Sequence, residues 1–257
     1  MSITTWQAQL RDNVTGVRAR IAEAARRAGR SPDDVRLVGV TKYVGADVLR
    51  ELVRAGVGDL GESRVQQLVA RAADCGPADL DWPGATPPAA EALPRWHMIG
   101  HLQRNKVGQL LGRARIVHSL DSQRLLRALE EQACRLGVLV DAFVEVNVSG
   151  EASKQGVSVD EAGPLIESAA GSSCVRLRGL MTMAPYDPEP EASRTVYARL
   201  RELLERLRTR GVAPATCVHL SMGMSQDYGV AVEEGATFVR VGSALFAGLP
   251  NTDPRAN

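Results

Sequence analysis

The 257-residue chain lacks an excess of charge of either sign, a long apolar run and an amino-terminal targeting pattern. Its 31 basic residues are balanced by 30 acidic ones, so the formal net charge is +1. Proteins that bind nucleic acid normally carry a basic patch, so we expect no nucleic-acid partner. No stretch approaches the roughly 18 apolar residues of a membrane span, and residues 1–7 show no signal-peptide pattern. We therefore expect a cytoplasmic protein with no membrane partner.

Cysteine is also scarce. The four cysteines, Cys75, Cys134, Cys174 and Cys217, lie far apart in the sequence and form no Cys-x-x-Cys pair. We expect all four to be reduced thiols, as is usual in the cytoplasm.

What the chain does contain is a regular alternation of short apolar runs and amphipathic segments. A helix is predicted first, over residues 5–28, because Leu10, Val14, Val17 and Ile21 recur at three- and four-residue spacing. Apolar runs typical of buried strands follow at residues 37–42, 57–61, 96–100, 116–120, 142–148, 177–183, 217–221 and 237–242. Because segments of helical period separate these runs, the pattern predicts parallel βαβ units.

Eight such units in about 250 residues predict an α/β fold, a single (β/α)₈ TIM-type barrel with an additional N-terminal helix. The alternative is an open doubly wound sheet, but no Gly-x-Gly-x-x-Gly motif follows the first strand, which excludes the usual dinucleotide-binding form. We expect one domain over residues 1–257. A proline- and glycine-rich segment at about 75–94 is expected to be a flexible insertion, and about 250–257 a disordered tail.

Lys42 is the most informative single residue, because it ends the first predicted strand. The active site of such a barrel forms at the carboxyl ends of the strands. A lysine amine that loses its proton there can attack an aldehyde and form a Schiff base. The alternative is a strand-end lysine that only reaches out to water.

The ends of the last two predicted strands resemble a phosphate site. Residues 221–225 read Ser-Met-Gly-Met-Ser, and residues 240–243 read Arg-Val-Gly-Ser. Glycine allows a ligand to approach the backbone closely, and free N–H groups and serine hydroxyls donate hydrogen bonds to a phosphate. Phosphate commonly binds after strands seven and eight of this architecture. Ordinary turn chemistry is the alternative.

Arg240 adds a third element. Strand eight pairs with strand one in a closed barrel, so Arg240 can face a ring attached to Lys42. A guanidinium against a pyridine nitrogen keeps that nitrogen unprotonated, because two positive charges in one pocket repel. A salt bridge at the barrel rim, for example with Glu62, is the alternative.

A Schiff-base lysine, a phosphate cradle and a partner for a ring nitrogen together describe a pyridoxal 5′-phosphate site. A class I aldolase acting on a sugar phosphate could use the same lysine and cradle. Such an enzyme normally carries its lysine on a middle strand, whereas Lys42 lies on the first.

Ordered motifs along nearly the whole chain resemble those of the pyridoxal phosphate homeostasis protein family. They are Val-Thr-Lys at 40–42, Leu-Gly-Glu at 60–62, Trp-His-Met-Ile-Gly-His-Leu-Gln-Arg-Asn-Lys at 96–106, His-Ser-Leu-Asp at 118–121, Val-Asn-Val-Ser at 146–149, Leu-Arg-Gly-Leu-Met at 177–181, Leu-Ser-Met-Gly-Met-Ser at 220–225 and Val-Arg-Val-Gly-Ser-Ala-Leu-Phe at 239–246.

The resemblance implies a barrel like the amino-terminal domain of alanine racemase, with pyridoxal phosphate held as an aldimine on Lys42. It further implies cofactor-binding residues: Ser225, Gly242 and Ser243 at the phosphate, Arg240 at the pyridine nitrogen, and Met224, Asn147 and His97 in the pocket. Two departures from the family pattern are Ser63, where the family has asparagine, and Gly229, where it has glutamate.

The resemblance favours a cofactor carrier for intracellular pyridoxal phosphate homeostasis, without turnover, over a pyridoxal-phosphate-dependent amino-acid racemase. Racemisation needs a base on each face of the substrate carbon, and Lys42 supplies only one. The racemase takes its second base, a tyrosine, from an additional β domain. Among the four tyrosines here, Tyr186 and Tyr228 are the only candidates. We expect a monomer whose partners are pyridoxal phosphate and the apo-enzymes that use it.

Overall fold

The structure, a computed structural model, describes residues 5–42, 44–75, 78–80, 82, 93–151 and 154–249. Eight strands form one closed parallel barrel, in which each strand pairs with the next and β8 pairs with β1. The strands are β1 (Arg36–Val40), β2 (Asp59–Glu62), β3 (Arg95–Met98), β4 (Ile116–Leu120), β5 (Val140–Glu145), β6 (Val175–Met181), β7 (His219–Ser221) and β8 (Phe238–Val241). The predicted TIM-type barrel is confirmed.

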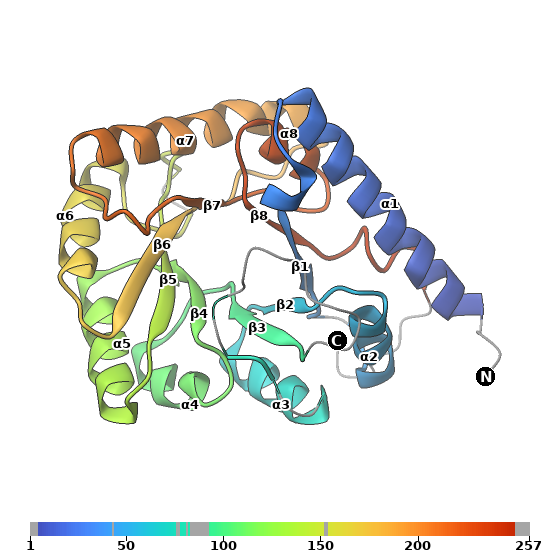
Figure 1. Ribbon diagram of the computed structural model, residues 1–257, viewed down its shortest axis with the longest axis horizontal. Coiled ribbons are helices and arrows are strands. Elements are labelled where there is room, and N and C mark those ends of the chain that lie inside the picture. Colours follow the sequence, from blue (N-terminus) through green and yellow to red (C-terminus); the bar gives the residue numbers. More distant parts are fainter. Residues whose placement is uncertain are drawn as a thin grey trace.

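A ring of helices surrounds the strands (Figure 1). They are α1 (Thr5–Arg27), α2 (Ala46–Arg54), α3 (Val65–Cys75), α4 (Val107–Leu111), α5 (Gln123–Leu136), α6 (Val159–Ala170), α7 (Arg194–Thr209) and α8 (Tyr228–Glu233), with 3₁₀ turns at η1 (Pro32–Asp34), η2 (Arg104–Lys106) and η3 (Pro190–Ser193). Within the described ranges, no helix is long and apolar enough to cross a membrane.

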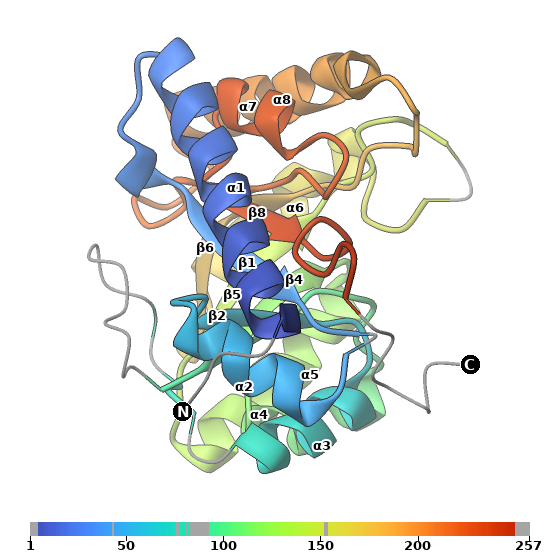
Figure 2. The same ribbon diagram turned by 90° about the vertical axis from the view of Figure 1, so that its right-hand side faces the viewer.

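The additional helix α1 lies across α8 and α2 on the side of the barrel where β8 meets β1 (Figures 1 and 2). Its predicted apolar stripe is buried, with Leu10, Val14, Val17 and Ile21 at most 5% exposed. Beside this stripe on the same helix, the Asn13 amide donates hydrogen bonds to the carbonyls of Leu245 (3.0 Å) and Ala247 (2.9 Å). The helix therefore fixes the segment that follows β8.

A small apolar cluster fills the inside of the barrel, formed by Val38, Ile116, Phe143, Met181 and Phe238. Trp82 covers this cluster at the amino end of the barrel. Its ring lies 5.6 Å from that of Phe238 and 4.4 Å from the Arg178 guanidinium. Trp82 belongs to the segment predicted to be a flexible insertion. Most of that segment, and the predicted tail at about 250–257, fall outside the described residues. The part that is described docks on the amino end of the barrel.

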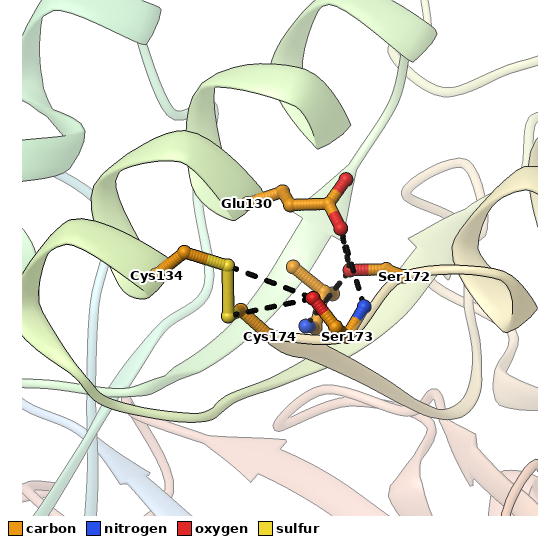
Figure 3. Close-up of a disulfide and its surroundings, with 6 residues drawn as sticks. Glu130, Cys134, Ser172, Ser173 and Cys174 are labelled. Carbon is orange, nitrogen blue, oxygen red and sulfur yellow. Dashed lines mark hydrogen bonds between the residues drawn. A yellow bond between two sulfur atoms is a disulfide. The ribbon is translucent and has the colours of Figure 1, made fainter.

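The expectation of four reduced thiols is wrong for two of them. Cys134 and Cys174 form a disulfide (Figure 3). Cys75 and Cys217 are free thiols. Helices of the barrel run antiparallel to the strands, so the end of α5 and the residue before β6 meet at the amino end of the barrel. Their Cα atoms are 5.6 Å apart, the usual distance for a disulfide, although 40 positions separate them in the sequence.

Candidate functional site

A cavity of about 770 Å³ opens at the carboxyl ends of the strands. Its wall includes residues from the ends of β1, β2, β3 and β8 and from the segment after β7. Of the eight residues predicted to bind the cofactor, six line it: Lys42, Met224, Ser225, Arg240, Gly242 and Ser243. Because parallel strands all end on the same side of the barrel, the residues that follow them meet at this cavity.

Hydrogen bonds to Arg71 and Glu62 hold the turn that carries Lys42. Strand β1 ends at Val40, two residues earlier than expected, and Lys42 follows it in a turn, where its side chain is exposed and lines the cavity. Its carbonyl accepts a hydrogen bond from Arg71 Nη2 (3.2 Å). The hydroxyl of the preceding Thr41 donates to Oε1 of the fully buried Glu62 (2.7 Å). These contacts fix the backbone of the turn that carries Lys42 at the cavity wall.

Glu62 also pairs with Arg71 at 3.2 Å, so it is not the partner of Arg240. Burial raises the pKa of the Glu62 carboxyl, although the Arg71 guanidinium and the Thr41 hydroxyl oppose the rise. The rim salt bridge considered for Arg240 is thus replaced by an ion pair between β2 and α3.

Two backbone donors converge where the sequence predicts the phosphate. The N–H groups of Gly242 and Ala244 both point to the Ser225 hydroxyl oxygen, at 3.0 and 3.4 Å. An added Cβ at Gly242 would lie only 3.3 Å from Val40 Cβ, so a larger residue would crowd the end of β1. Ser225, Gly242 and Ser243 line the cavity here, and their N–H and O–H groups are a donor set suited to an oxyanion.

The turn that presents Ser225 depends on Asp227, which is 1% exposed. Asp227 Oδ1 accepts a hydrogen bond from the Met224 N–H (2.7 Å). Oδ2 accepts from the hydroxyls of Ser193 (2.9 Å) and Tyr197 (2.8 Å). A buried carboxylate with three donors ties the segment after β7 to α7.

We predict that Asp227→Ala lowers the free energy of unfolding by about 2 kcal/mol, because it leaves two buried hydroxyls and one backbone N–H without an acceptor. Tyr197→Phe, which removes a single bond to the same carboxylate, should cost about 1 kcal/mol. Urea unfolding of the three proteins measures both differences. A loss for Asp227→Ala no larger than that for Tyr197→Phe would contradict the anchoring role.

Arg240 points into the barrel and is 4% exposed. Its Nη1 donates to the Ser221 hydroxyl (2.6 Å) and its Nη2 to the Thr182 carbonyl (2.9 Å). Burial lowers the pKa of the guanidinium, and the acidic groups of Tyr197, Glu145 and Asp227 oppose that shift. Bonds from two different nitrogens fix the plane of the guanidinium at the cavity wall.

The structure places neither His97 nor Asn147 on the cavity wall, and their contact with a cofactor stays a prediction. His97 is fully buried inside the barrel, where it bonds to His118 and Asp59. Asn147 follows β5 and organises its own loop: its Oδ1 accepts from the Gly150 N–H (3.0 Å) and its Nδ2 donates to the Glu151 carbonyl (2.8 Å).

Glu145, at the end of β5, is a residue that the sequence reasoning missed. It is 2% exposed, and its Oε2 has no hydrogen-bond partner among the described residues. Burial raises its pKa to about 7; nearby Asp121 adds to the rise and Arg240 opposes it. Alternation from Asp141 through Phe143 to Glu145 could have revealed that this carboxyl faces the barrel interior.

We predict that Glu145 makes the ligand-free protein less stable as the pH rises. The folded state keeps a proton that the unfolded chain loses above its ordinary pKa of 4.5, so the free energy of unfolding falls between about pH 4.5 and about pH 7. Glu145→Gln should therefore match the parent protein at pH 4 and exceed its stability by about 2 to 3 kcal/mol at pH 8.

Urea unfolding at several pH values measures this difference directly, and Glu167→Gln, on the exposed face of α6, is the control that should show none. Equal stabilities of parent and Glu145→Gln at pH 8 would contradict the prediction. Histidines that titrate in the same range affect both proteins equally, so they cancel in the comparison.

Comparison with known proteins agrees with this geometry. The sequence model of the family described as alanine racemase, N-terminal domain, matches residues 13–250. The pyridoxal phosphate homeostasis proteins of Aquifex aeolicus and Pseudomonas aeruginosa are 38% and 37% identical to the chain; each match covers 91% of this chain, with 96% and 94% of the respective relatives.

Solved structures give the same result. A protein from Bifidobacterium adolescentis is similar with a TM-score of 0.82 and 32% identity over 95% of this chain and 98% of that one. PipY of Synechococcus elongatus, solved with PLP bound, has a TM-score of 0.71 and 29% identity over 88% of this chain and all of PipY. An alanine racemase of Clostridium difficile shares the fold at 15% identity, with a TM-score of 0.65 over 94% of this chain and 56% of the racemase.

Fold and site thus define a barrel of the alanine racemase N-terminal-domain class. Within that class, the sequence identity to the Aquifex and Pseudomonas proteins extends over nearly their whole length and identifies one family. The chain belongs to the pyridoxal phosphate homeostasis protein family.

Proposed function

We propose that this protein binds pyridoxal 5′-phosphate through a Schiff base on Lys42 and serves intracellular pyridoxal phosphate homeostasis without catalytic turnover. One observation carries the proposal: a lysine amine, a set of oxyanion donors and a fixed guanidinium line a single cavity. Its volume of about 770 Å³ lies in the range of ligand pockets.

Each chemical feature of the cofactor has a counterpart on the cavity wall. When bound, pyridoxal phosphate supplies an aldehyde and an electron-accepting ring. Lys42 would bind the aldehyde carbon, and the Ser225 hydroxyl with the Gly242 N–H would hold the phosphate, which would replace Ser225 Oγ as the acceptor of that N–H. Ser243 adds a further hydroxyl at the same wall. Arg240 would face the ring nitrogen as a permanent cation and so keep it unprotonated.

Absorption spectroscopy and borohydride trapping test the proposal. Added pyridoxal phosphate should give a band near the boundary of the visible and ultraviolet ranges, and reduction should fix the cofactor to one side chain. The chain has three lysines, Lys42, Lys106 and Lys154, so peptide mapping has few possible answers. An adduct on Lys106 or Lys154 would refute the assignment.

The racemase alternative needs a second base, and the described tyrosines do not provide one at the cavity. Tyr197 and Tyr228 are buried, and Tyr186 is 78% exposed; none of the three lines the cavity. Tyr43 lies outside the described residues. Incubation of the loaded protein with a panel of L-amino acids should therefore yield no D-isomers.

We further propose a monomer in the cytoplasm that exchanges the cofactor with apo-enzymes. The proposal of a monomer rests on the small number of exposed large apolar side chains. Among the described residues there are five: Leu93, Leu136, Leu139, Tyr186 and Val218. Light scattering of the purified protein tests the oligomeric state, and activation of an apo-enzyme by the loaded protein tests the exchange.

A further inference from the structure

Behind Arg240, a row of buried polar side chains crosses the interior of the barrel. Ser221 Oγ lies 2.6 Å from Arg240 Nη1 and 2.7 Å from His118 Nδ1. His118 Nε2 lies 3.0 Å from His97 Nδ1, and His97 Nε2 lies 3.2 Å from Asp59 Oδ1. Ser221, His118 and His97 are fully buried, and Asp59 is 4% exposed. Four consecutive hydrogen bonds thus connect the cavity wall to the first residue of β2.

The two groups at the ends of this row determine which partner donates in each of its hydrogen bonds. A guanidinium can only donate hydrogen bonds, and an ionised carboxylate can only accept them. Burial opposes ionisation of Asp59, yet the hydrogen bond from His97 and the charge and hydrogen bond of Arg95 hold its pKa at about 2. Asp59 is therefore an acceptor at every ordinary pH.

The groups between these ends then have one arrangement that satisfies every atom. Ser221 accepts from Arg240 and donates its own proton to Nδ1 of His118. His118 must then carry its proton on Nε2 and donate it to Nδ1 of His97, which in turn donates from Nε2 to Asp59. His118 is neutral, as this requires, because burial lowers its pKa well below the ordinary value and the charge of the Arg240 guanidinium adds to that effect.

The opposite direction leaves a group without a partner. If His118 carried its proton on Nδ1, Ser221 Oγ would receive protons from both His118 and Arg240. The Ser221 hydroxyl, which has no exposure to water, would then lose the acceptor for its own proton. A buried donor without an acceptor is costly.

We infer that Ser221, His118 and His97 are positioning residues for Arg240: a one-directional row, ended by Asp59, that holds the guanidinium in place at the cavity. The inference rests on the proposed function only for the identity of the ligand. The bonds to Ser221 and Thr182 use two of the five N–H donors of Arg240, so donors remain for an acceptor such as a ring nitrogen.

The decisive variant is His97→Phe, because His97 lies far along the row from Arg240. Without an acceptor for its Nε2 proton, His118 should move that proton to Nδ1 and donate it to Ser221, in competition with Arg240. The matched control is His219→Phe. His97 and His219 both lie beside Phe238, with ring centroids 6.1 and 5.6 Å from it, but His219 belongs to no part of the row.

Nitrogen NMR of the ligand-free protein, labelled at its four histidines, reads the tautomers without any cofactor. We expect His97 and His118 to carry their protons on Nε2 in the parent protein and in His219→Phe. We expect Nδ1 protonation of His118 in His97→Phe. A His118 of the parent protein that is protonated on Nδ1, or on both nitrogens, would overturn the direction of the row.

Titration with pyridoxal phosphate then tests the effect on Arg240. The dissociation constant should rise about tenfold in His97→Phe, the equivalent of one weakened charge-assisted hydrogen bond, with a displaced absorption band. It should stay within about twofold of the parent value in His219→Phe. A His97→Phe protein that changes its tautomer but binds like the control would show that the row does not position Arg240.

A second pair of variants decides the question if His97→Phe does not fold. Ser221→Ala cuts the row next to Arg240, and Ser119→Ala removes an equally buried serine whose hydroxyl donates to the Gly100 carbonyl at 2.6 Å. Only Ser221→Ala should weaken binding, and equal effects would reject the inference. If the parent protein bound no pyridoxal phosphate, the proposed function would fail, while the tautomers would still confirm or reject the row.

Discussion

Lys42→Ala should abolish covalent capture of pyridoxal phosphate completely. Among the described residues no lysine would then remain at the cavity wall to form a Schiff base, so the absorption band should be absent and borohydride should fix no cofactor. The residues proposed to hold the phosphate, Ser225, Gly242 and Ser243, would be intact. We therefore expect non-covalent binding to persist, weakened at least about 100-fold, and fluorescence quenching can measure it.

Lys106→Ala and Lys154→Ala are the matched controls, because they remove the remaining lysines and neither side chain lines the cavity. Both should keep the absorption band and the adduct. Pyridoxal without its phosphate should bind far more weakly than the phosphate ester to the parent protein, because it lacks the group that the donors hold. Equal affinity for the two ligands, or a persistent adduct in Lys42→Ala, would refute the site.

The second large effect is expected at the disulfide. A bond between Cys134 and Cys174 closes a loop with a sequence separation of 40, and the chain-entropy model assigns such a loop about 3 to 4 kcal/mol of stability. The double variant Cys134→Ser/Cys174→Ser should lose that amount in urea unfolding. A reducing agent should destabilise the parent protein to the same extent and leave the variant unchanged.

Thiol alkylation gives an independent measurement. In the denatured but unreduced protein, only the free thiols of Cys75 and Cys217 should react, and reduction should expose the other two. The control variant Cys75→Ser keeps the disulfide and should respond to the reducing agent like the parent. Alkylation of all four cysteines before reduction would contradict the bond.

Part of the site could be predicted because it depends on local sequence. Lys42 follows an apolar run, and the pairs Gly223–Ser225 and Gly242–Ser243 follow two others. Once the strands are known to be parallel, their carboxyl ends must meet on one side. Six of the predicted residues lie at one cavity for this reason.

His97 shows where such reasoning ends. Its motif places it on the third strand, but nothing in the local pattern says whether the imidazole reaches the cavity or fills the barrel. The answer depends on Asp59 and His118, which are 38 and 21 positions away in the sequence.

By itself, the sequence determined the number and order of the strands, the closed barrel and the place of Lys42 and of the two glycine- and serine-containing segments at the carboxyl ends of their strands. These follow from hydrophobic periodicity, from turn residues and from the geometry of parallel strands, all of which act over short stretches of chain. Only the tertiary structure decided the Cys134–Cys174 bond, the burial of Glu145 and the row behind Arg240. Each of these is a contact or an environment created by distant segments, as when His118 and Ser221, 103 positions apart, meet inside the barrel.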